Sequence, residues 1–87
     1  MVTVSKMVYF DGHVIHVLEW SGYVQVNVGG YAFSIPVGRL LDRLEVHVAW
    51  ITGCVETADA AAFHHKIVDL VRELVLLPKT IRFGVKR

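Results

Sequence analysis

Apolar and polar positions alternate along the first 37 residues with the two-residue period that is typical of β-strands. These runs, rich in Val, Ile, Tyr, Phe and Trp, are separated by three dipeptides: Asp11-Gly12, Ser21-Gly22 and Gly29-Gly30. Each dipeptide has a glycine where a tight hairpin turn requires a positive φ. The pattern therefore predicts a four-stranded antiparallel β-meander with two-residue turns at 11–12, 21–22 and 29–30.

Two-residue turns also fix which residues face each other across neighbouring strands. The resulting register places Val8 opposite Ile15, and Val26 opposite both Val17 and Phe33, on one nearly all-apolar face. Trp20 and Tyr23 are predicted to lie on the opposite face from the residues that a long helix, described next, would cover: Val8, Ile15, Val17, Val26, Val28 and Phe33. The other face, called the polar-aromatic face below, collects Thr3, Ser5, Met7, Tyr9, Val14, His16, Leu18, Trp20, Tyr23, Gln25, Asn27, Ala32, Ser34 and Pro36.

A period of three and four residues governs residues 58–77 and predicts a long amphipathic α-helix. Thr57 is placed to cap the start of this helix and Pro78 to end it. A helix of this length extends roughly 30 Å, enough to lie across the apolar face of the meander. Its predicted buried stripe consists of Ala60, Phe63, Ile67, Leu70, Val71, Leu74 and Leu77.

The signals conflict in the segment that joins the meander to the long helix. Helical spacing relates several of its apolar residues, and Gly53 is placed to end such a helix. Residues 44–50, however, alternate as a strand does and include several β-favouring types. We predict a helix over about 38–52, with a strand over 45–52 as the alternative. The helical stripe would consist of Val37, Leu40, Leu41, Leu44, Val48 and Ile51.

After Pro78 the alternation returns, and it predicts a short C-terminal strand over about 80–85. If this strand lies beside the first strand with its apolar side inward, Arg82 reaches the polar-aromatic face. The sequence as a whole predicts an α+β fold class in a single domain spanning residues 1–87.

The composition bears on assembly. The hydrophobic fraction is 54% in a chain of only 87 residues, whose core is limited by its size. We therefore expect a second copy to cover part of the apolar surface in a homodimer. The net charge of +1 gives no overall argument for nucleic acid or membranes, and no apolar run approaches the roughly 18–20 residues that span a bilayer.

The scarce residue types bear on location and source. The single cysteine, Cys54, excludes an internal disulfide, so we expect a reducing, cytoplasmic location. One glutamine and one asparagine beside sixteen valines give one mark of a thermophilic source. The enrichment in Lys and Glu that is the other mark is missing.

No group of residues in the sequence points to catalysis or to a metal. His13 and His16 point to opposite faces of a strand. His64 and His65 lie about 100° apart on a helix, so they cannot hold one ion by themselves. Nothing in the sequence places a base beside Cys54, and the carboxylates form no pair in a cleft. We therefore expect no enzymatic activity, no cofactor and no metal site.

The polar-aromatic face has two competing uses. Its apolar and aromatic members form a patch that a second copy would cover in a dimer. Alternatively, its rings would stack on the bases of single-stranded DNA or RNA while its polar groups bond base edges. We expect a small homo-oligomeric, non-enzymatic structural or interaction protein, with a single-stranded nucleic-acid-binding module as the alternative. The candidate binding residues in either case are Tyr9, His16, Trp20, Tyr23, Gln25, Asn27 and Arg82.

Two observations favour the nucleic-acid alternative. Four of the nine basic residues lie within the last nine positions, with no acid among them: Lys79, Arg82, Lys86 and Arg87. The predicted order, a curved antiparallel meander followed by a long helix, is similar to that of single-stranded-DNA-binding proteins of the transcriptional-coactivator type. This likeness concerns topology alone, because no sequence motif accompanies it.

Overall fold

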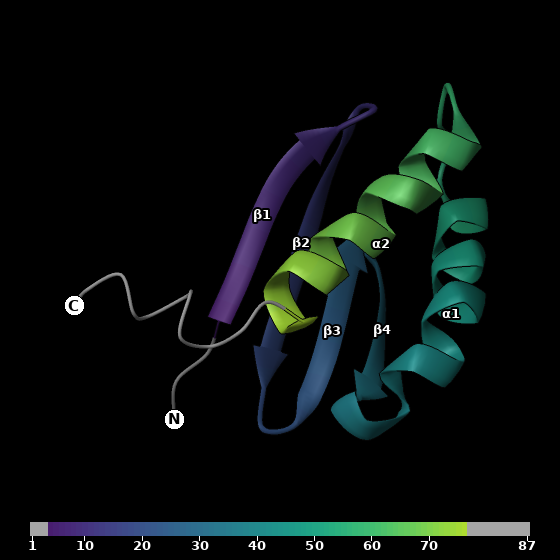
Figure 1. The fold of residues 1–87 in the computed structure, drawn as a ribbon. Helices are drawn as coiled ribbons and strands as arrows, with labels where there is room; N and C mark the ends of the chain where they lie inside the picture. Colours follow the sequence, from purple (N-terminus) through teal and green to yellow (C-terminus); the bar gives the residue numbers. More distant parts are fainter. Residues whose placement is uncertain (1–3, 77–87) are drawn as a thin grey trace.

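The computed structural model describes residues 4–76, which form an open antiparallel sheet covered on one side by two helices (Figure 1). The strands follow one another in the sheet in chain order, β1-β2-β3-β4. Their register is the predicted one, with Val8 opposite Ile15 and Val26 opposite both Val17 and Phe33. The predicted α+β meander is therefore confirmed. Its strands are β1 (Val4–Phe10), β2 (His13–Trp20), β3 (Tyr23–Val28) and β4 (Tyr31–Pro36).

All three turns use positive φ at both central residues, as two-residue hairpins that match the twist of the strands require. At the second turn φ is +51° for Ser21 and +83° for Gly22. A Cβ added to Gly22 would meet no atom within 4 Å, so a substitution there strains the backbone alone. The turn conformation is thus the specific reason for glycine at this position.

We expect Gly22→Ala to lower the free energy of unfolding by about 1–2 kcal/mol, because alanine is strained in the left-handed region. Gly53→Ala is the matched control, since Gly53 lies inside a helix at an ordinary φ with open space around its Cα. That change should raise stability by about 0.5–1 kcal/mol. Urea unfolding measures the change in the free energy of unfolding for each variant. If both variants change stability in the same direction, the turn conformation is not the reason for glycine at position 22.

The ambiguous segment is helical. A short 3₁₀ turn, η1 (Val37–Arg39), leads into α1 (Leu40–Cys54), which buries Leu44, Val48 and Ile51 and leaves Val46 and Trp50 exposed. The strand alternative over 45–52 is therefore wrong. The expected end at Gly53 is also wrong, because the helix continues through it and ends where Val55 becomes extended.

The second helix, α2 (Ala60–Leu76), matches the predicted range closely but begins differently. Asp59, not Thr57, caps it: its Oδ1 accepts a hydrogen bond from the Ala62 amide at 3.1 Å. The Asp11 carboxylate in turn accepts hydrogen bonds from the Ala58 amide at 3.0 Å and from the Asp59 amide at 3.2 Å. The first hairpin turn is thereby tied to the start of α2.

These amide hydrogen bonds, that from Ala58 first and that from Asp59 second, lower the pKa of Asp11 below its ordinary value. A lowered pKa in the folded state stabilises the fold above the unfolded-state pKa and loses that effect as pH falls through the folded value. We expect Asp11→Ala to be destabilising at neutral pH, with the difference from wild type shrinking below about pH 4. Asp11→Asn tolerates the same backbone but removes the charge and one of the two oxygens that accept these hydrogen bonds. Urea unfolding at several pH values checks this, and a pH-independent difference would contradict it.

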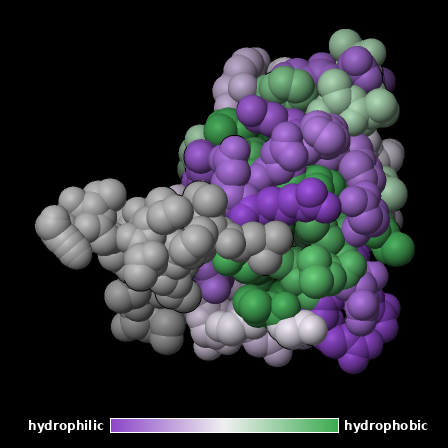
Figure 2. All heavy atoms as spheres, viewed as in Figure 1, coloured by the Kyte–Doolittle hydropathy of each residue, from purple (hydrophilic) through white to green (hydrophobic). Residues whose placement is uncertain are grey.

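Both helices lie on the apolar face of the sheet, side by side (Figure 1). α2 packs against β1 and β2, whereas α1 packs against β4. Phe33 was predicted to lie under the long helix; instead its ring contacts His47 of α1, with centroids 5.2 Å apart. Figure 2 shows hydrophilic residues over the outer side of α2 and hydrophobic surface lower in the view. One hydrophobic core lies between the inner face of the sheet and the inner faces of both helices.

Most of the predicted stripe of α2 is buried, from Phe63 to Leu74. Ala60 is exposed instead, because it lies in the first turn of α2, and Val68 joins the core although the stripe did not include it. Leu77, Pro78, Arg82 and the predicted strand over 80–85 lie outside the described residues, as does Thr3. None of the described helices is long and apolar enough to cross a membrane.

Candidate functional site

The polar-aromatic face lies on the side of the sheet opposite to both helices. Strand alternation places it there, because each of its residues neighbours a core residue such as Ile15 or Val24 along the same strand. The large side chains on it remain open: Tyr9 is 75% exposed and Trp20 is 46% exposed. The exposed large hydrophobic residues of this face are Met7, Tyr9, Val14, Trp20 and Tyr23.

The aromatic residues occupy the two ends of the face. Trp20 and Tyr23 flank the second turn as a directly opposed cross-strand pair, and Pro36 continues their row on β4. Tyr9 faces Val14 at the other end. Val14 and Trp20 are six positions apart along β2, which corresponds to roughly 20 Å. Tyr9 therefore cannot act together with the Trp20–Tyr23 pair on one base.

Polar groups fill the middle of the face. Gln25 Nε2 donates a hydrogen bond to Asn27 Oδ1 at 3.1 Å, and both side chains are half-buried. His16 on β2 is paired with Met7 of β1 on one side and with Asn27 of β3 on the other, and its side chain is also half-buried. The sequence prediction is correct in bringing His16, Gln25 and Asn27 together. Part of their hydrogen-bonding capacity is already used within the face.

The face carries no full charge within the part of the chain that the structure describes. Between Ser5 and Pro36, its members include no Asp, Glu, Lys or Arg. Lys6 and Glu19 belong to the opposite, helix-covered face. Arg82, the predicted phosphate contact, lies outside the described residues. The described face is thus apolar and aromatic at its ends and polar at its centre, without an acid, a lysine or an arginine.

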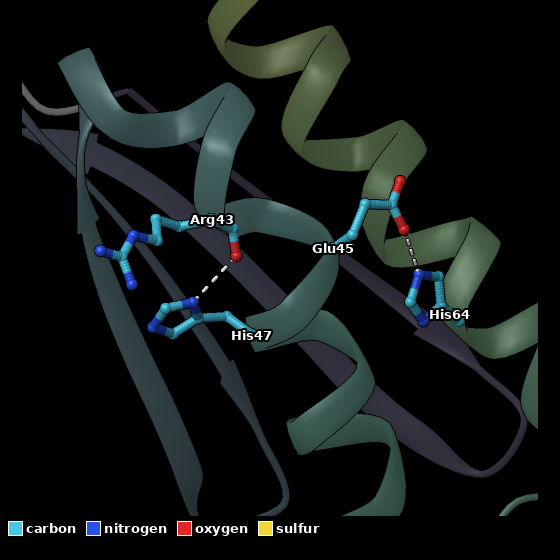
Figure 3. Close-up of polar contacts among 4 residues, drawn as sticks. All are labelled: Arg43, Glu45, His47 and His64. Atoms are coloured by element: carbon cyan, nitrogen blue, oxygen red, sulfur yellow. Dashed lines mark hydrogen bonds and ion pairs between the residues drawn. The ribbon is translucent and has the colours of Figure 1, made fainter.

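Titratable side chains elsewhere connect elements of the fold. Lys6 Nζ donates a hydrogen bond to Glu73 Oε1 at 2.8 Å, and this contact lowers the pKa of Glu73 below its ordinary value. His64 Nε2 lies 2.7 Å from Glu45 Oε1, joining α2 to α1 (Figure 3). Across residues 4–76, no three His, Cys, Asp or Glu side chains lie close enough to hold a metal ion.

Sequence reasoning missed a second exposed apolar region, on the helix side of the molecule. Tyr31 and Trp50 meet edge to face with their centroids 6.2 Å apart, at the start of β4 and on α1. Val46 lies one turn before Trp50 on the same side of α1 and is 69% exposed. The missed signal is the spacing of Val46 and Trp50, four residues apart and off the buried stripe of a helix.

Comparisons with known proteins were made at the level of both sequence and fold. A scan against protein-family models, a search of curated proteins and a search of solved structures each returned no match to this chain. The likeness to coactivator-type proteins therefore has no support beyond element order.

Proposed function

We propose that this protein is a small, non-enzymatic, homo-oligomeric interaction protein whose copies associate through the polar-aromatic face. The observation that carries the proposal is the combination of exposed large apolar side chains with the lack of full charges on the described part of this face. Exposed contiguous apolar surface of this kind marks an interaction site. We infer a cytoplasmic location from the single cysteine, Cys54.

A second copy is the occupant that this chemistry favours. In a twofold pair the same patch is used by both copies, so a face that carries one sign of charge would bury like charges against each other. The described face avoids that cost, and its central Gln25 and Asn27 amides can hydrogen-bond across the axis because each amide both donates and accepts. Two sheets stacked about 10 Å apart would enclose Trp20 and Tyr23.

Sedimentation equilibrium across the micromolar range tests the proposal. A dimer would give twice the 9.8 kDa mass of one chain. A mass that stays at that of one chain across this range would refute association through the face.

Single-stranded nucleic-acid binding is the second candidate function. It is favoured by the exposed Trp20–Tyr23 pair beside hydrogen-bonding side chains, because each base stacked on a ring contributes about 1–3 kcal/mol. The neutral face weighs against it, since most of the affinity for nucleic acid comes from cations that neutralise phosphates. In this candidate function Arg82 and the other basic residues near the end of the sequence would have to supply those cations.

A titration with labelled single-stranded DNA and RNA at several salt concentrations separates the two candidates. Binding that weakens steeply with salt and is lost in both Trp20→Ala and Tyr23→Ala would establish the second candidate. A dimer that shows no measurable affinity for either strand at low salt would remove it.

A further inference from the structure

Among the described strands, none pairs with the outer edge of β4, which is called the free edge below. A groove, called the edge groove below, runs along this edge between β4 and α1. It has an apolar end and a basic end that share His47. The apolar end is lined by Ala32, Phe33, Val46, His47 and Trp50. The basic end is lined by Ser34, Ile35, Pro36, Arg39, Arg43 and His47.

The strand that borders the groove has backbone groups directed away from the sheet. A two-residue turn makes Val28 and Tyr31 a hydrogen-bonded pair, and such pairs recur at every second residue of an antiparallel ladder. The amides of Tyr31, Phe33 and Ile35 therefore face β3, whereas those of Ala32 and Ser34 face outward. Pro36 has no N–H and ends this outward row. An extended chain beside β4 would find two donors and two acceptors at strand spacing.

At the apolar end, α1 provides a wall beside this edge. Trp50 is 50% exposed and is held against Tyr31, while Val46 lies one turn away on the same side of the helix. The nearly buried Phe33 forms the floor. A large apolar side chain of an added strand would contact all three surfaces.

At the basic end, His47 is fixed in position by two contacts. Its Nδ1 lies 2.9 Å from the Arg43 carbonyl oxygen, so Nδ1 must carry the proton and donate it, and its ring lies on Phe33. This leaves Nε2 for a ligand. Figure 3 shows Arg43 and His47 projecting from one side of α1, and Glu45 from the other side toward His64.

The charges at this end are mainly positive. Within residues 4–76, no carboxylate lies at ion-pair distance from Arg43. Arg39 makes only a long contact with Asp42, 3.9 Å between Nε and Oδ2, and both side chains are exposed. The basic end would therefore attract a carboxylate, and an arginine can hold one through two parallel hydrogen bonds.

We propose that the edge groove binds an extended acidic peptide segment of a partner protein, which adds to β4 as a further strand. Its acidic residues would lie beside Arg43 and Arg39, and a large apolar residue would lie against Trp50 and Val46. Strand addition of this kind draws affinity from main-chain hydrogen bonds and specificity from the flanking side-chain contacts. The edge groove shares Ala32, Ser34 and Pro36 with the margin of the polar-aromatic face, but its remaining lining comes from α1 and from Phe33 and Ile35 on the helix side of β4, so the proposal does not rest on the function proposed above.

Charge complementarity decides between this occupant and a second copy of the chain. A β4–β4 pair would place Tyr31–Pro36 in the groove, and this strand contains no acid to meet Arg43. Nucleic acid is disfavoured because the apolar end lacks cations, and the outward amides of Ala32 and Ser34 are spaced for a peptide backbone.

The test begins with selection of short random linear peptides displayed on phage against the intact chain. Selected peptides should carry Asp or Glu toward one end and a large apolar residue toward the other. Binding of the consensus peptide should slow hydrogen exchange of the Ala32 and Ser34 amides. Trp50→Ala should weaken it about tenfold, as loss of an aromatic anchor does, and Arg43→Gln should weaken it and flatten its salt dependence.

Matched controls keep the test specific. Arg72→Gln removes an equal charge from the exposed side of α2, and Trp20→Ala alters only the polar-aromatic face; both should bind the peptide as wild type does. Val46→Glu should block binding of the peptide. Because Val46 is exposed, the amide spectrum of this variant should remain that of a folded protein. The proposal is overturned if selected peptides show no enrichment in acids, if Trp50→Ala and Arg43→Gln bind normally, or if oligo-dT rather than peptide protects Ala32 and Ser34.

Discussion

Replacing Trp20 with alanine is expected to convert the proposed dimer into monomers at micromolar concentration while leaving the fold intact. Trp20 lies at one end of the polar-aromatic face, opposed by Tyr23, and makes no part of the helix-side core. An aromatic anchor at an interface commonly contributes about 2 kcal/mol or more to the binding free energy. A twofold interface contains Trp20 of both copies, so the substitution removes this contribution twice. The dissociation constant should then rise by well over tenfold. Sedimentation equilibrium measures the mass, and circular dichroism measures the fold.

Trp50→Ala is the matched control for this prediction. Trp50 is exposed to nearly the same extent as Trp20, but it lies on α1, on the other side of the sheet. Its replacement should leave the dimer intact. If Trp20→Ala remains a dimer, or if Trp50→Ala dissociates it, the assignment of the interface to the polar-aromatic face is wrong. A Trp20→Ala protein that stays assembled but loses affinity for single-stranded DNA would favour the alternative function.

The second large effect is expected at Phe63, whose replacement by alanine should lower the free energy of unfolding by about 3–5 kcal/mol. Phe63 is 0% exposed and connects α2 to the first hairpin. Its ring contacts that of Phe10 at 6.2 Å and that of His13 at 5.6 Å between centroids. Small domains have a total stability of only about 5–15 kcal/mol, so urea unfolding should show a large shift in midpoint.

Phe63→Leu is the control, because it keeps most of the buried volume and should cost much less than the alanine change. Phe10→Ala offers a second comparison: Phe10 touches the same ring but is only partly buried. We expect its cost to fall between those of the two Phe63 variants. A loss below about 1 kcal/mol for Phe63→Ala would mean that the first hairpin and α2 do not share one core.

The meander could be predicted in full because its determinants are local. A two-residue turn with glycine constrains the residues on both sides of it, and strand alternation then assigns every side chain to a face. The same logic identified the exposed Trp20–Tyr23 pair and the central Gln25 and Asn27. Three turns that agree on one apolar face leave little freedom for an alternative register.

The start of α2 was predicted less well, for a reason that lies elsewhere in the chain. Thr57 and Asp59 are both capable of capping a helix. The Asp11 carboxylate, from the first hairpin turn, holds the amides of Ala58 and Asp59, and the helix begins only after them. The start of α2 therefore depends on two hydrogen bonds between distant parts of the chain. Asp11 is 47 positions from Ala58 and 48 positions from Asp59, and local sequence patterns do not contain such contacts.

By itself, the sequence determined the strands, their register, the composition of both sheet faces and the existence of the long helix, because each follows from periodicity and turn chemistry within a few residues. Only the tertiary structure decided between helix and strand for residues 45–52. Because α2 packs against β1 and β2, α1 packs against β4 beside it, and as a helix it buries Leu44, Val48 and Ile51 there. It also decided that Arg43, His47 and Trp50 border the free edge of β4. That juxtaposition joins a helix to a strand through packing, and no spacing along the chain encodes it.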